Sequence, residues 1–159
     1  MIQMENVTKQ YANGVTAIKN LNLEIHDGEF VYVIGPSGAG KSTFVKMLYH
    51  ELMPTSGTIK IDDFDFATMK PSRVPFLRRH IGIVFQDFKL LPRLTVYENI
   101  AYAMQVIEAP DEKIKDRVLE VLGLVGLEQK LRRFPDELSG GEQQRVSVAR
   151  AIVNKPKVL

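Results

Sequence analysis

Apolar and polar residues alternate in the first third of the chain. A leucine or isoleucine occupies every second position of the segment 20–25, which is typical of a strand with one buried face. The shorter segment 58–61 shows the same alternation. The pairs Asn13-Gly14 and Asp27-Gly28 tolerate the positive φ of tight turns and are typical of hairpins. We therefore expect antiparallel strands at the front of the chain.

Two later segments are apolar without alternation. They are Phe30–Ile34 and Ile81–Phe85. A continuous apolar run of this length suits a strand that is covered on both faces, as in a parallel sheet. We therefore expect both segments to be buried strands.

Helical spacing follows the first apolar run and dominates from Thr95 onward. Apolar residues recur at positions 44, 48 and 52 and stop near Pro54. In the segment 113–125 an apolar face opposes a charged one. A final helix is expected from near Ser139 to about Val153, and residues 157–159 resemble the opening of another strand. Strands and helices in this order predict an α/β fold with an antiparallel β part first and a helical part after it.

Composition and charge narrow the possible functions. The chain has 159 residues, 45% of them hydrophobic, which suffices for one domain with its own core. With 21 basic and 19 acidic residues, the net charge of +2 gives no reason to expect a nucleic-acid partner. Without cysteine, neither disulfides nor thiolate metal sites can form. No signal peptide or transmembrane run is evident, so we expect any membrane association to be peripheral, through a partner or a surface contact.

The strongest motif lies directly after the first apolar run. The residues Gly35, Pro36, Ser37, Gly38, Ala39, Gly40, Lys41 and Ser42, followed by Thr43, match the phosphate-binding pattern G-x-x-x-x-G-K-[ST]. Glycines let successive backbone N–H groups point inward as an anion nest, and the helix that follows adds the positive end of its dipole. Lys41 would reach the β- and γ-phosphates, and Ser42 would offer a hydroxyl to Mg²⁺. The alternative is a glycine-rich turn without a ligand, but the expected strand and helix on either side favour a nucleotide site.

A second motif lies about a hundred residues later, in the sequence Leu138, Ser139, Gly140, Gly141, Glu142, Gln143. Ser139 and Glu142 have the spacing of a capping box, which by itself predicts only a well-formed helix start. The two intervening glycines cost helix stability and expose backbone N–H groups at a positive helix end. This arrangement is typical of a second anion site.

The two motifs together resemble the ABC-type ATPases. The segment 35–43 resembles their Walker A motif, and 138–143, followed by Gln144-Arg145-Val146, resembles their signature motif. Gln86 lies at the Q-loop position, and Tyr11 at the position of the aromatic residue that stacks on adenine. The resemblance implies a P-loop NTPase fold with a β subdomain and P-loop core at about 1–92 and a helical subdomain at about 93–154. It also implies ATP as the nucleotide, Mg²⁺ held by Ser42 and Gln86, and a head-to-tail homodimer in which the signature motif meets the ATP of the partner.

Within this family the chain is similar to FtsE, the bacterial cell-division ATP-binding proteins. The segments Val74–Arg79, Phe85–Pro92 and Leu94–Asn99 carry this similarity. It implies an ATPase subunit at the cytoplasmic face of the membrane, bound to an integral membrane partner like FtsX and controlling septal peptidoglycan hydrolysis. The ATPases of lipoprotein-releasing and macrolide-type exporters share much of this pattern and remain the first alternative. A short nucleotide-binding or interaction module without hydrolysis is the second.

The family pattern extends beyond Leu159. The resemblance implies a Walker B aspartate, a catalytic glutamate and a switch histidine after this point. His26, His50 and His80 all precede the signature motif, and no catalytic residue is assigned within residues 1–159. Because general-base catalysis needs a group within hydrogen-bond reach of the attacking water, we expect these residues to bind ATP without hydrolysing it.

Overall fold

In the computed structural model, which describes residues 1–159, the chain divides into two units, Met1–Arg78 and Arg79–Leu159. The first holds the sheet and the glycine-rich loop, and the second holds the signature motif. The subdomain limits expected from the sequence, at about 92 and 93, stay a prediction.

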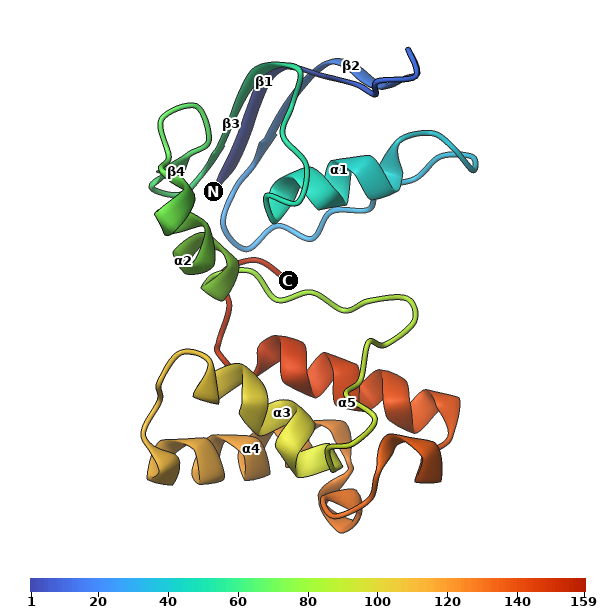
Figure 1. Ribbon diagram of the computed structural model, residues 1–159, viewed down its shortest axis with the longest axis vertical. Coiled ribbons are helices and arrows are strands. Elements are labelled where there is room, and N and C mark those ends of the chain that lie inside the picture. The colour runs from blue at the N-terminus through green and yellow to red at the C-terminus, as the bar shows by residue number, and fades with distance from the viewer. The chain divides into compact units, whose positions relative to one another are not determined.

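The alternating segments of the first unit form an antiparallel sheet in the order β2-β1-β3-β4 (Figure 1). The strands are β1 (Ile2–Gln10), β2 (Thr16–Ile25), β3 (Ser56–Ile61) and β4 (Phe64–Asp65). The turn at Asn13-Gly14 joins β1 to β2, and Gly14 has the positive φ of 83° that such a turn requires. The antiparallel front of the chain is therefore confirmed.

Helix α1 (Lys41–Leu48) packs on this sheet through its buried residues Thr43, Phe44 and Met47. It ends at Leu48, one turn earlier than the sequence spacing predicts, so Leu52 lies beyond it. A short 3₁₀ helix (Pro71–Arg73) and α2 (Val74–Arg79) follow β4. Arg78 ties α2 to the end of α1, because its guanidinium donates to the carbonyls of Tyr49 and His50 at 3.0 and 3.1 Å.

The first apolar run does not form the predicted strand. Phe30–Ile34 makes no backbone hydrogen bond, and the side chains of Phe30, Tyr32 and Ile34 are mostly exposed. A strand exists only with a hydrogen-bonded neighbour, and no strand of this structure pairs with the run. For the same reason the turn at Asp27-Gly28 closes no hairpin.

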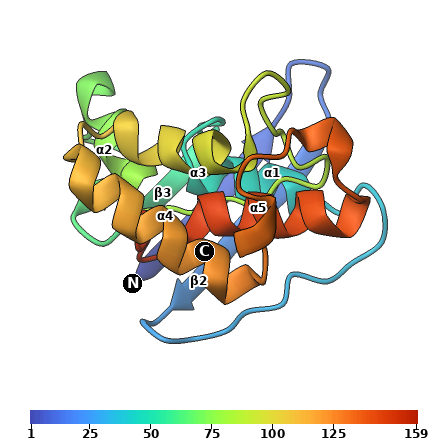
Figure 2. The same cartoon turned by 90° about the horizontal axis from the view of Figure 1, so that it is seen from below.

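In the second unit, α3 (Val96–Gln105), α4 (Asp111–Val125) and α5 (Gly140–Ile152) pack against one another (Figures 1 and 2). Two 3₁₀ helices, Glu128–Lys130 and Pro135–Glu137, connect α4 to α5. The apolar faces that the sequence predicts meet in one core, which includes Ile100, Val118, Leu122, Val146 and Ala149. None of the helices is long and apolar enough to cross a membrane.

The second apolar run is also not the predicted strand. Only Ile81 pairs, in a single parallel bridge with Val158, while Val84 and Phe85 lie in an irregular, exposed segment. The bridge is the one trace of the expected parallel pairing, and it supports an extended segment at Val158. As in the first run, these residues have the apolar composition of a buried strand, but no neighbouring strand pairs with them beyond the bridge at Ile81.

Candidate functional site

The glycine-rich loop, residues 35–40, leads into α1 and is shaped by positive φ angles. Gly35, Gly38 and Gly40 have φ of 154°, 81° and 88°. At Gly40 space is restricted as well, because an added Cβ would lie 2.3 Å from the carbonyl oxygen of Ala17 in β2. At Gly38 no atom lies within 4 Å of such a Cβ. The last glycine of the motif therefore both turns the chain and lets the loop approach the sheet.

The start of α1 offers unpaired donors to an anion. Its N-cap is Gly40, which supplies no side-chain hydrogen bond, so the first N–H groups of the helix lack partners within it. The positive end of the helix dipole lies at the same place. Ser42 is exposed there, and its hydroxyl makes no hydrogen bond with the chain. The loop and the helix start can therefore bind a phosphate group.

Lys41 lies over the loop instead of extending into solvent. Its Nζ donates to the carbonyl oxygens of Gly35 at 2.7 Å and Pro36 at 2.8 Å. These neutral acceptors hold the ammonium beside the loop without neutralising it. An incoming phosphate, which carries negative charge, would make stronger charge-assisted hydrogen bonds with the same group.

Tyr11 belongs to the same unit as the loop. Its hydroxyl forms a 2.9 Å hydrogen bond with the hydroxyl of Thr43, which is buried in the first turn of α1. Tyr11 is 36% exposed, and Nζ of Lys9 lies 5.8 Å from the centroid of its ring. The structure thus brings Tyr11 next to the helix that carries Lys41, with part of its ring still open to a ligand.

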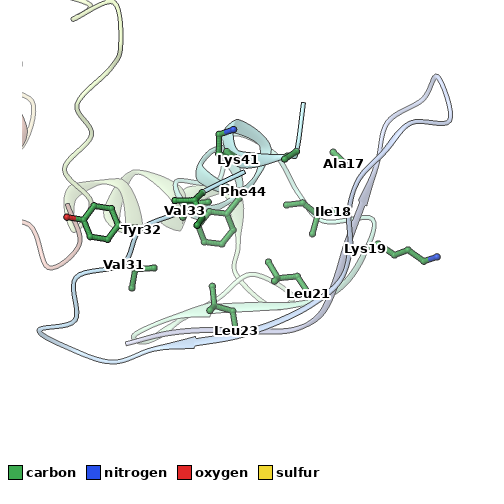
Figure 3. Close-up of a pocket in the computed structure, with 13 residues that line it drawn as sticks. Ala17, Ile18, Lys19, Leu21, Leu23, Val31, Tyr32, Val33, Lys41 and Phe44 are labelled. Atoms are coloured by element: carbon green, nitrogen blue, oxygen red, sulfur yellow. The ribbon is translucent and has the colours of Figure 1, made fainter. Parts of the chain in front are cut away.

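A cavity of about 490 Å³ lies between β2, the segment 31–34 and the start of α1 (Figure 3). Leu21 and Leu23 point from β2 toward Phe44 of α1, with Val31 and Val33 nearby. The lining is mostly apolar, but it also includes Ala39, Gly40 and Lys41 of the phosphate motif. The cavity therefore borders the anion site. Sequence reasoning did not predict it, although the alternation of β2 marks the residues that line it.

The signature motif forms a capped helix start in the second unit. The carboxylate of Glu142 accepts from the backbone N–H and the hydroxyl of Ser139, both at 2.8 Å. The Ser139 oxygen also accepts from the N–H of Glu142, which completes the predicted capping box. These bonds, together with Lys130 at 3.4 Å, lower the pKa of Glu142 to about 2.

The other signature residues divide into buried and exposed ones. Leu138 is buried, and the side-chain amide of Gln143 donates to the carbonyls of Pro135 and Leu138. Gly140 and Gly141 are exposed, and an added Cβ at either would meet no atom within 4 Å. Contacts within the chain therefore do not require glycine at these two positions, whereas a ligand approaching the backbone would.

Gln86 lies in the second unit, and its exposed side chain makes no hydrogen bond with the chain. Tyr11 and the phosphate loop lie in the first. The predicted residues thus form two groups, and their assembly into one site stays a prediction. No group of three or more histidine, aspartate or glutamate side chains is placed to hold a metal ion.

Comparisons with known proteins agree on one family. A family model described as ABC transporter matches residues 18–159. The cell division ATP-binding proteins FtsE of Bacillus subtilis and Streptococcus pneumoniae are 62% and 56% identical to the chain over 159 residues, covering all of it and 70% and 69% of their own lengths. The ATP-binding cassette MJ0796, in a dimeric post-hydrolysis state bound to ADP and Pi, has a TM-score of 0.86 at 40% identity and covers 98% of this chain and 71% of its own.

Proposed function

Because the chain belongs to the ABC transporter family of ATPases, and within it to the FtsE group, we propose that it is the ATP-binding subunit of a bacterial cell-division complex. The family and the ABC ATPase fold expected from the sequence are confirmed. The observation that carries the proposal is the phosphate loop, which holds the ammonium of Lys41 beside unpaired backbone N–H donors. The chain that contains this loop is 62% identical to a cell-division ATP-binding protein.

On this proposal, the loop and the start of α1 hold the phosphates of ATP. Lys41 exchanges its two carbonyl partners for phosphate oxygens, and the backbone N–H groups of residues 40–43 complete the nest. The free Ser42 hydroxyl suits Mg²⁺, since this ion prefers oxygen ligands and is bound together with phosphates. Mg²⁺ there would neutralise charge on the phosphates. Tyr11 stacks its open face on adenine.

The signature motif serves the ATP of a second copy. In a head-to-tail homodimer, Ser139 and the exposed backbone of Gly140 and Gly141 face the γ-phosphate held by the partner's loop. The positive end of α5 favours this contact electrostatically. Gln86 would help to ligate Mg²⁺ and to sense the attacking water. The exposed, uncrowded glycines of the capped helix start support this role.

The complex includes an integral membrane partner like FtsX. The chain binds it peripherally at the cytoplasmic face of the membrane, and ATP binding and hydrolysis control septal peptidoglycan hydrolases through it. An affinity-tagged chain expressed in its own bacterium should recover an FtsX-like protein from detergent-solubilised membranes. Recovery of an exporter permease without such a protein would instead support the lipoprotein-releasing or macrolide-type alternative.

Nucleotide binding is tested by titrating the chain with a fluorescent ATP analogue in the presence of Mg²⁺. Lys41→Ala should weaken binding by about ten- to a hundredfold, because it removes charge-assisted hydrogen bonds to phosphate. Lys46→Ala is the matched control, since this lysine of the same helix pairs with Glu51 at 2.7 Å, outside the loop. Equal affinity of the parent chain and the Lys41→Ala variant would overturn the proposed site.

A further inference from the structure

The turn that follows Gln86 contains two consecutive residues in left-handed backbone. Phe88 has φ of 56° and Lys89 has φ of 48°. A residue with a side chain is disfavoured in this region, because Cβ comes too close to the following carbonyl oxygen. Such a conformation persists only where surrounding contacts hold it in place.

Within the turn, the N–H of Phe88 donates to Phe85 at 3.0 Å, and Lys89 bonds to Asp87 through its N–H and its ammonium, both at 2.6 Å. Helix α5 supplies the contacts from outside the turn. The hydroxyl of Ser147, which is fully buried, donates to the carbonyl of Phe88 at 3.2 Å. The guanidinium of Arg150 donates from Nη2 to the same carbonyl and from Nη1 to the carbonyl of Lys89, both at 2.7 Å. The two side chains are three residues apart and therefore project from the same face of the helix.

The placement of Arg150 is costly. Its guanidinium is partly buried and makes no ion pair, and its polar contacts are confined to the two carbonyls of the turn. Burial lowers the pKa of Arg150 from its ordinary value, with no nearby carboxylate to offset the desolvation. A partly buried cation without a counter-ion destabilises the fold unless its hydrogen bonds compensate. Its contacts point to a role in holding the turn.

The far side of the turn is fixed as well. Asn99 of α3 is fully buried, accepts from the backbone N–H of Leu91 at 2.8 Å and donates to the carbonyls of Leu91 and Leu94 at 3.1 and 2.9 Å. The segment 88–94 is thus attached to α5 at its beginning and to α3 at its end. Gln86 lies two residues before this attached segment.

We propose that Arg150 and Ser147 are positioning residues for Gln86. By holding the carbonyls of the turn, they make it move with α5, so that a displacement of the signature helix reaches Gln86 through three side-chain hydrogen bonds. The part assigned to Gln86 rests on the proposed function, whereas the link between α5 and the turn is testable without nucleotide.

The test is residue-resolved amide exchange of the whole chain, measured by NMR. Arg150→Gln should raise exchange at the amides of Phe88 and Lys89 by about tenfold or more and shift the side-chain amide signal of Gln86, since hydrogen bonds to a charged group are lost. Arg145→Gln is the control, because this exposed arginine of the same helix has no polar contact in the chain. The exchange rates of Arg150→Lys should lie between those of Arg150→Gln and Arg145→Gln, because an ammonium cannot reproduce the planar fork of hydrogen bonds to two carbonyls.

A second variant separates positioning from general packing. Glycine tolerates positive φ, so the turn of a Lys89→Gly chain should depend less on the hydrogen bonds from α5. Adding Arg150→Gln to that chain should then raise amide exchange at the turn by a smaller factor. The inference fails if Arg150→Gln raises exchange equally throughout α3, α4 and α5, or if the glycine background leaves its effect unchanged. Should Arg150→Gln not fold, Arg150→Lys carries the same comparison. Lys41→Ala should leave exchange at the turn unaltered, so failure of the nucleotide proposal is recognised separately.

Discussion

Gly40 and Gly38 offer a matched pair for testing what fixes the phosphate loop. Both have left-handed backbone, with φ of 88° and 81°. Alanine at either position should therefore cost roughly 1–2 kcal/mol of stability. At Gly40 the new Cβ would also lie 2.3 Å from the carbonyl oxygen of Ala17, whereas at Gly38 it meets nothing within 4 Å. Because Cβ is fixed to its own Cα and the oxygen that it meets belongs to the backbone of β2, neither atom can rotate away. The start of α1 must therefore shift away from β2, which adds a cost of about 1–3 kcal/mol.

We therefore expect Gly38→Ala to lower the free energy of unfolding by about 1–2 kcal/mol and Gly40→Ala by about 2–5 kcal/mol. Since the chain has no tryptophan, urea unfolding is followed by far-ultraviolet circular dichroism. Amide exchange then locates the change, which should lie in α1 and β2 and spare α3–α5. Equal losses in the two variants would refute the argument, because they would mean that the contact with Ala17 costs nothing beyond the φ angle.

Three further predictions concern the second unit. Hydrogen bonds from Ser139 lower the pKa of Glu142 from 4.5 to about 2. The ionised carboxylate therefore stabilises the fold fully above its unfolded pKa. This stabilisation declines as the pH drops below the unfolded pKa and is lost as the pH falls through the folded pKa. Glu142→Gln should therefore approach the parent chain in urea stability as the pH is lowered from about 6 to about 3, and a constant difference would contradict this. Arg117 donates to the carbonyls of Val153 and Ile152 at 2.9 and 3.0 Å. Arg117→Ala should cost about 1.5–3 kcal/mol in the same assay and the exposed Lys113→Ala less than about 0.5 kcal/mol, and equal losses would exclude a role for these bonds. The Cβ added by Gly141→Ala would meet no atom within 4 Å, so this substitution should raise helix stability by up to about 1 kcal/mol. It should at the same time weaken ATP-dependent dimerisation, measured by analytical ultracentrifugation; undiminished dimerisation would argue against the signature contact.

Features encoded by neighbouring residues could be predicted from the sequence. The hairpin at Asn13-Gly14 follows from turn chemistry, and the capping box of Ser139 and Glu142 from a spacing of three residues. The apolar face of α4 follows from its period. In each case the sequence segment contains both partners of the interaction that stabilises it.

Features that depend on distant partners could not be predicted. The segment 81–85 has the composition of a buried strand, yet only Ile81 finds a partner, at Val158. The contacts of Arg150 with Phe88 and Lys89 join residues about sixty positions apart, and no local pattern marks the arginine. The bond between Tyr11 and Thr43 likewise arises only when the hairpin and α1 meet.

The phosphate loop shows how these two kinds of information combine. Its sequence pattern identifies the loop, and the expected strand before it suggests how the loop is held. In the structure that preceding segment makes no backbone hydrogen bond, so the loop must be held from its other side. Gly40 lies against Ala17, and Thr43 bonds to Tyr11, and both of these contacts come from the β1–β2 hairpin or the residue that follows β1. The hairpin therefore determines where α1 begins, and with it where the N–H groups that would bind phosphate lie.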